Sequence, residues 1–563
     1  MKFELLPNEI FIEIFEYLST YDIFYSFNRL NNHFNQIIGS IPLHLKFTNI
    51  QKPLFDKFCQ LLLSNPEFKN QIYTLELSNK ETPDQIKTFI SFFSFHDFHY
   101  LHSLTLIQIS DNLFQHIKFI LPQLHSFHLI DSNDIYLTNS LISHLQILTI
   151  PTLSSIDKLS SSSSITNLTI SGCSLDQLFS YVFKYVPMLN HLTIEYFSNY
   201  YSWEKNSFDN HEYKAIHLKE LNIFNSEYKF QDIQNLLKST PNLINLKICG
   251  TCDLDMIDGN QWENFIRSSL VYLTKFQFIF KYIFKTSIDH IYDKLNQFQN
   301  NFWIKQHQWY SEYSLSTSSV IIYTIPYILN YYKLEVDSKK YSNQFLNTFD
   351  NVKHLILYHK VNRESYEYYF TNIKSLIIIP PENNSSLLFN MEIFRSLKLM
   401  INLSNIEHLG ISFNFQIENS RVLLEILQSL PKLSSLMINF RNFIRFTSNK
   451  ELCEYLNKTI KKLDIYKYYS LTFKYYYEKT DLCQIFSNIE QFKCNIDEIH
   501  DLLYLLKHLP KLTKLNAYFR KIKDYDRFRC WFKDQTKKLN LPFDIKCIDT
   551  YESEVSVWIN REI

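Results

Sequence analysis

The sequence predicts an α/β chain in which three short N-terminal helices precede a curved solenoid, with a parallel sheet inside, helices outside and a central insertion. Three observations support this fold class: a six-residue apolar phrase recurs, segments of helical periodicity separate its copies, and the chain opens with LPNEIFIEIFEYL at residues 6–18. A chain of 563 residues is also too long for one ordinary compact core. We therefore expect several domains or a stacked repeat array.

The phrase apolar-x-x-apolar-x-apolar occurs in two runs, and successive copies within a run start 20 to 33 residues apart. The first run starts at Leu101, Leu124, Leu145, Ile165, Leu189, Leu218 and Leu243, and the second at Val352, Ile373, Ile406, Leu433, Ile460, Ile489 and Leu512. Helical spacing separates many copies, as in LDQLFSYVFKYV, FQDIQNLLKST, RVLLEILQSL and EIHDLLYLLKHL. One strand–helix unit cannot bury its own apolar face, but stacked units share a core. The other interpretation, a doubly wound α/β domain, would need more strands than one open sheet usually holds.

The phrase resembles the leucine-rich-repeat family, whose longer motif places Asn or Cys three residues beyond the last apolar position. Cys173 and Asn414 stand there, whereas most other copies depart from the motif, so the repeats are degenerate. The resemblance covers about residues 70–547. It implies a scaffold that binds a protein, with no particular ligand.

The opening stretch predicts an amphipathic helix of about three turns. Pro7 suits a first helical turn, and Ile10, Ile14, Phe15 and Leu18 recur along one side. A second helix is expected after Tyr21, with Thr20 or Asp22 as its cap, and a third through NNHFNQII. Three such helices form too small a core to be stable alone, so the module should need another surface to pack against.

These residues resemble the F-box motif, through Leu6-Pro7, Glu9-Ile10, Ile14-Phe15, Leu18, Asp22-Ile23, Leu30 and Phe34. At the end of the motif LNNHF departs from the family pattern, with Leu30 for Val, Asn31 for a small residue and Phe34 for Trp. An F-box before leucine-rich repeats is similar to the substrate receptors of cullin-type E3 ubiquitin ligases. The resemblance implies that the Skp-type adaptor, and through it the cullin complex, binds Leu6, Pro7, Ile10, Ile14, Phe15, Leu18, Leu30 and Phe34. Two alternatives stay open: a helical cap on the solenoid, and a repeat scaffold with no role in ubiquitin transfer.

The predicted domains are an F-box at 1–45, a helical linker at 46–69, a repeat arc at 70–280, an aromatic-rich insertion at 281–351, and a second arc with a C-terminal cap at 352–563. In the insertion the phrase disappears, and Trp303 and Trp309 precede a β-rich run from Val320 to Ile325. We expect a hairpin, with the tryptophans packed against the solenoid; the alternative is a local binding function. A serine-rich stretch from Ser154 should be a loop.

Composition excludes several classes of function. Lysine plus arginine and aspartate plus glutamate both number 57, so net charge gives no indication of a nucleic-acid or membrane partner. The five glycines are too far apart for a phosphate-binding loop. Nine scattered cysteines suit reduced thiols, and Glu4, Glu9 and Glu13 interrupt any signal peptide. We expect a soluble protein of the cytoplasm and/or nucleus.

Two candidate sites for chemistry remain. Cys249 and Cys252 form a CxxC without a second such pair, so an unconnected thiol pair is favoured over a zinc site. His96, His99 and His102 have ligand-like spacing, but His102 lies inside a strand phrase. No nucleophile–base–orienter set can be assigned. The sequence therefore predicts no enzyme, catalytic residue, metal or cofactor, and a substrate receptor needs none because it contributes proximity.

The last three phrases predict a substrate-binding face. Because side chains alternate along a strand, the third, fifth and seventh residues of a phrase should point away from the core. This places lysines beside tyrosines on one surface, namely Lys462, Tyr466, Lys493, Lys514 and Tyr518. Such a surface favours an acidic or phosphorylated segment of a protein substrate. The alternative is that these are solvated strand residues without a ligand.

Overall fold

The computed structural model describes residues 6–559 apart from 49, 51, 81, 83, 118–123, 133–134, 138, 154–161, 198–212, 285–288, 336–337, 342–347, 359–367, 381–387, 413–414, 440–444, 466–475, 497, 520–524, 539–542 and 550–552. Contacts divide the chain into two units. The first holds 1–282 and 288–309, and the second holds 283–287 and 310–563. The serine-rich stretch predicted as a loop lies largely outside the described residues. No helix among the described residues is long and apolar enough to cross a bilayer.

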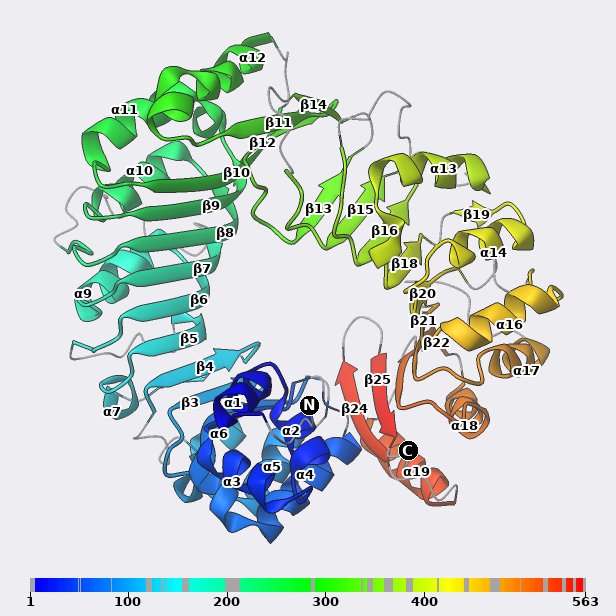
Figure 1. Ribbon diagram of the computed structural model, residues 1–563. Coiled ribbons are helices and arrows are strands. Elements are labelled where there is room, and N and C mark those ends of the chain that lie inside the picture. Colours follow the sequence, from blue (N-terminus) through cyan, green and yellow to red (C-terminus); the bar gives the residue numbers. More distant parts are fainter. Residues whose placement is uncertain are drawn as a thin grey trace. The chain divides into compact units, whose positions relative to one another are not determined.

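The first unit is built on parallel strands that are hydrogen-bonded in chain order. They are β1 (Leu43–Lys46), β2 (Ile72–Ser78), β3 (Ser103–Ile107), β4 (Ser126–Ile130), β5 (Ile147–Thr152), β6 (Asn167–Cys173), β7 (His191–Phe197), β8 (Glu220–Tyr228), β9 (Asn245–Cys252) and β10 (Lys275–Ile283). Figure 1 shows the helices that follow the strands on one face of this sheet.

The helices of the first unit begin with the predicted N-terminal three. They are α1 (Asn8–Glu16), α2 (Thr20–Phe27), α3 (Asn32–Ser40), α4 (Lys52–Ser64), α5 (Gln85–Phe92), α6 (Asp111–Ile117), α7 (Asn139–Ile142), α8 (Leu175–Gln177), α9 (Phe183–Tyr185), α10 (Phe230–Lys238), α11 (Gly259–Ser269) and α12 (Asp289–Asn296). A π-helical segment, Leu178–Val182, joins α8 to α9. Ser19 caps α2 by accepting a hydrogen bond from the Asp22 backbone N–H (3.1 Å), so the cap is neither of the two predicted residues.

The second unit combines an antiparallel group with a second parallel sheet. β11 (Ser311–Leu315) pairs antiparallel with β12 (Ser319–Thr324) and β14 (Lys339–Tyr341). The parallel strands are β13 (Tyr331–Leu334), β15 (His354–Tyr358), β16 (Ser375–Ile379), β18 (His408–Ile411), β20 (Ser435–Met437), β21 (Lys462–Asp464), β22 (Gln491–Asn495) and β23 (Lys514–Phe519). Two antiparallel strands, β25 (Ser553–Ile559) and β24 (Phe543–Asp549), end this sheet.

Helices cover one face of this second sheet as well (Figure 1). They are α13 (Met391–Met400), α14 (Ser420–Gln428), α16 (Lys450–Thr459), α17 (Tyr476–Ile485), α18 (Ile499–His508) and α19 (Tyr525–Lys538). A short parallel pair, β17 (Leu388–Phe389) and β19 (Gln416–Ile417), lies between repeats. The chain thus has a leucine-rich-repeat-like α/β fold, with long and mostly parallel sheets that alternate with helices.

The repeat phrase explains where the strands lie. Each of the fourteen predicted copies contains a strand that begins at the third residue of the phrase. The fourth and sixth residues are buried, as Leu104 and Leu106 are in β3. The third and fifth residues alternate to the opposite face, as pleated strands require. The predicted strand–helix unit and its inward positions are therefore confirmed.

The aromatic segment before the hairpin packs into the first unit. Trp303 lies in a π-helical segment, Phe302–Gln306, and is fully buried with its ring centroid 4.7 Å from that of Phe298. The Trp309 indole N–H donates to the Thr274 carbonyl oxygen at 3.2 Å. The tryptophans therefore pack as predicted, and β11 and β12 form the expected hairpin. The division between the units falls inside the range 281–351, and the five predicted domain ranges remain predictions.

Candidate functional site

The three N-terminal helices share an aromatic core. Phe11, Phe15 and Phe34 are buried, and the rings of Phe11 and Phe34 meet edge to face with centroids 5.0 Å apart. Phe27 joins them at 5.2 Å from Phe34 and 5.1 Å from Phe15. The Asn31 side chain caps α3 by accepting from the Phe34 backbone N–H at 2.9 Å. Phe15 and Phe34 thus hold the module together from inside.

This module is attached to the first strand of the sheet. The Thr20 hydroxyl donates to the His44 carbonyl oxygen of β1 at 2.8 Å. Phe24 of α2 packs edge to face on Phe58 of α4 and on Phe68, with centroid distances of 5.6 and 4.7 Å. These contacts supply the surface that the small core was expected to need.

Apolar side chains remain exposed on the outside of the module. Ile10 and Ile12 on α1 are 38 and 37% exposed, and Leu30, between α2 and α3, is 59% exposed. Tyr17 at the end of α1 is 89% exposed. Exposed apolar side chains raise the free energy of the protein in water, and a partner that covers them lowers it.

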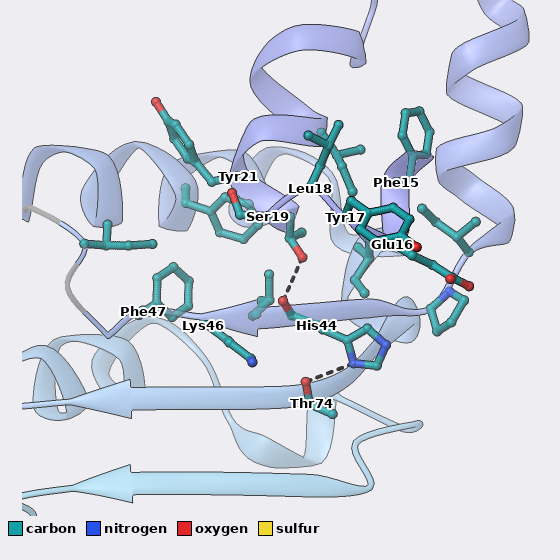
Figure 2. Close-up of a pocket in the computed structure, with 18 of the residues that line it drawn as sticks. Phe15, Glu16, Tyr17, Leu18, Ser19, Tyr21, His44, Lys46, Phe47 and Thr74 are labelled. Carbon is teal, nitrogen blue, oxygen red and sulfur yellow. Dashed lines mark hydrogen bonds between the residues drawn. The ribbon is translucent and has the colours of Figure 1, made fainter. Parts of the chain in front are cut away.

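A cavity of about 610 Å³ lies between the module and β1. Figure 2 shows Phe15, Leu18 and Tyr21 across from His44 and Phe47. His44 Nδ1 lies 3.1 Å from the Thr74 hydroxyl of β2, which orients the imidazole at the rim. A cavity with this lining can hold an apolar side chain of a bound protein.

The structure sorts the eight predicted adaptor-binding residues by exposure. Pro7, Ile10 and Leu30 are exposed, whereas Leu6, Ile14 and Leu18 are half-buried. Phe15 and Phe34 are core residues of the module, although Phe15 also borders the cavity. Ile12 and Tyr17 are exposed beside these residues but were missing from the prediction, because the F-box resemblance does not rest on them.

The predicted substrate-binding lysines lie on three neighbouring strands of the second unit. Lys462 is exposed, whereas Lys493 is half-buried, with its Nζ 3.4 Å from an Asp464 carboxylate oxygen and 5.4 Å from the centroid of the Tyr518 ring. Lys514 lies over the ring of Trp558 at 5.5 Å, because β25 pairs with β23. This C-terminal strand was not predicted, because it has no copy of the phrase. Tyr466 lies outside the described residues.

The same face carries an apolar row that sequence analysis did not single out. Ile356, Ile377, Gly410 and Met437 lie opposite one another on β15, β16, β18 and β20. All four occupy the fifth position of their phrases, so the signal was present in the sequence. The three side chains are half-buried, on the face away from the helices.

The corresponding row of the first unit is polar. Thr105, His128, Thr149, Thr169 and Thr193 are neighbours across five strands. The His128 ring nitrogens lie 2.7 Å from the hydroxyls of Ser126 and Thr149, and burial lowers the pKa of His128. The two units therefore present chemically different faces.

The two candidate sites for chemistry lie apart from these surfaces. Cys249 and Cys252 are buried free thiols on β9, and burial raises the pKa of Cys249 to about 12. His99 Nδ1 lies 3.1 Å from the side-chain oxygen of Asn70, and the His102 ring packs on Tyr73 with centroids 5.0 Å apart. Among the described residues no cluster of His, Cys, Asp and Glu could hold a metal ion.

Comparisons with known proteins add little to these observations. No family model and no curated protein matches the sequence. Among solved structures, the chain is similar to a leucine-rich-repeat protein of Leptospira interrogans at 12% identity, covering 80% of this chain and 97% of that one, with a TM-score of 0.21. This likeness is weak. The repeat character therefore rests on the strand phrases and the parallel sheets, and the F-box resemblance on the residues quoted for it.

Proposed function

We propose that the chain is a substrate-recognition adaptor of a cullin-type E3 ubiquitin ligase, in which the N-terminal module binds the Skp-type adaptor and the repeats bind a protein substrate. The observation that carries the proposal is the exposed apolar surface of the module, formed by Ile10, Ile12, Tyr17 and Leu30. Ile10 and Leu30 belong to the residues that resemble the F-box. Ile12 and Tyr17 lie beside them in the sequence and also line the cavity. The ligase would use the chain for proximity alone.

A second candidate function is a protein-binding repeat scaffold with no part in ubiquitin transfer. The contacts of Thr20 with β1 and of Phe24 with Phe58 favour it, because they make the module a cap on the first strand. The two functions differ in whether the module also binds an adaptor. Only the first predicts binding through the outer apolar surface.

The test is binding of the Skp-type adaptor to the full chain by calorimetry. Leu30→Asp should weaken it at least about tenfold, because covering the exposed part of a leucine contributes about 1–2 kcal/mol and a buried carboxylate adds a further cost. Leu399→Asp is the matched control, since Leu399 on α13 is 56% exposed and Leu30 is 59% exposed. Absence of adaptor binding by the unaltered chain, or equal binding by both variants, would favour the scaffold.

A further inference from the structure

The half-buried apolar row on the second sheet is closely packed. A Cβ at Gly410 would lie 2.8 Å from Met437 Cε and 3.1 Å from Ile377 Cγ1. The two side chains therefore close over the glycine and form one continuous apolar strip with Ile356. The strip runs across the strands, with one residue from each of the neighbouring strands β15, β16, β18 and β20.

Basic groups border this strip on the same face. The parallel row contains His354, Ser375, His408, Ser435 and Lys462, one residue from each successive strand, and none of these is acidic. Burial lowers the pKa of the His408 imidazole, and the neighbouring His354 and Lys462 lower it further. Beyond Lys462 the same row continues to Gln491 and Lys514.

One acidic side chain, Asp464, adjoins the basic row and offsets part of its positive charge. Asp464 follows the apolar strip directly, opposite Met437, but Lys493 lies 3.4 Å from its carboxylate. Lys462 is exposed, and its strand β21 lies between the last strand of the apolar strip, β20, and the strands that carry Lys493 and Lys514. In the first unit the equivalent positions on β5, β6 and β7 carry threonines, Thr149, Thr169 and Thr193, in place of aliphatic side chains.

We propose that this face of the second unit binds a protein segment that carries aliphatic side chains followed by carboxylates. The aliphatic side chains cover Ile377 and Met437, and the carboxylates meet Lys462 and the lysines of the next strands. This proposal names the class of substrate for the proposed function. It rests on that function only in taking the bound protein to be a substrate for ubiquitin transfer, since a scaffold would bind the same segment with the same face.

The strand spacing sets the spacing within the segment. Ile377 and Lys462 lie three strands apart, which is about 14 Å at about 4.8 Å per step. An extended segment covers this distance with about four residues. The aliphatic and acidic residues should therefore be separated by about four positions.

The test is selection of random twelve-residue peptides, displayed on phage, against the full chain. We expect selected peptides to carry Leu, Ile, Val or Met with Asp or Glu about four positions away. A synthetic peptide of the selected consensus should bind Lys462→Glu and Met437→Asn at least about tenfold more weakly, because like charges repel in the first variant and an uncharged polar amide replaces the apolar contact in the second. The control is Lys275→Glu, which should bind as the unaltered chain does: Lys275 is an exposed lysine at the first residue of β10, as Lys462 is at the first residue of β21.

Further measurements make the result decisive. Lys462→Glu should bind the charge-reversed peptide, with lysines in place of its acids, better than the unaltered chain does. The Skp-type adaptor is measured in parallel, so a loss of adaptor binding without a loss of peptide selection rejects the ligase role alone. Failure to select peptides, a consensus without acids, or equal binding by all three variants overturns the inference.

Discussion

A buried ion pair in the second unit gives a prediction whose magnitude follows from the structure. Lys340 Nζ lies 2.9 Å from Glu312 Oε2, and the two side chains are only 8 and 1% exposed. The Thr348 hydroxyl donates to the same carboxylate oxygen at 2.9 Å, and the ammonium lies 5.3 Å from the centroid of the Phe349 ring. Removing one partner leaves a charge in an apolar environment.

Lys340→Met should therefore lower the free energy of unfolding by about 3–5 kcal/mol, as breaking a buried pair commonly does. Adding Glu312→Gln should restore most of this loss, because the uncompensated charge disappears. Urea unfolding gives the total effect, and amide hydrogen exchange in β11 and β14 locates it in the second unit. Lys374→Met is the control: its ion pair with Glu407 is half-exposed, so the unfolding midpoint should hardly move.

A loss of stability in Lys340→Met no larger than that in Lys374→Met would contradict a stabilising role of the buried ion pair. A double variant that is less stable than Lys340→Met alone would contradict it as well. Either result would mean that water or rearrangement, and not the ion pair, compensates the Glu312 charge.

Three further predictions concern the first unit. Trp303→Ala should lower stability by about 3–5 kcal/mol in thermal or urea unfolding, because a fully buried indole is removed, and an unchanged midpoint would contradict its packing role. Cys249 should resist iodoacetamide at pH 8 in the folded protein, since burial raises its pKa to about 12, whereas the exposed Cys530 should react; mass spectrometry reports both. Burial lowers the pKa of His128 below its usual value of about 6.5, so the unfolded chain takes up a proton at higher pH than the folded chain. The contribution of neutral His128 to the free energy of unfolding should be present above about pH 6.5 and decline as pH falls through the folded pKa. His128→Gln should reduce this decline when urea unfolding is measured at several pH values.

Much of the repeat fold was predictable because its signal is local. A buried position alternates with an exposed one along every strand, so the phrase marks strands without knowledge of their partners. Two further copies, which start at Ile72 and Leu273, also match the phrase and form β2 and β10, but they were not among the predicted copies. The short β1 and the antiparallel β24 and β25 carry no such phrase.

The candidate sites were only partly predictable. Sequence placed Lys462 on an outward position, and the structure agrees, but the contacts of Lys493 with Asp464 and of Lys514 with Trp558 depend on strand register. The residues of the apolar strip all occupy the fifth position of their phrases. They could be recognised as one surface only when the pairing of β15, β16, β18 and β20 was known.

Local sequence patterns were enough to predict the repeat period, the fourteen counted strands and the amphipathic opening helix, because these follow from backbone geometry over a few residues. The tertiary structure alone decided that Phe15 and Phe34 are core while Ile12 and Tyr17 face outward, since exposure depends on what packs against a helix. It also decided that β25 lies beside β23, a pairing across a long stretch of chain that no local pattern specifies. A residue's secondary structure is set by its neighbours in sequence, whereas its availability to a partner is set by its neighbours in space.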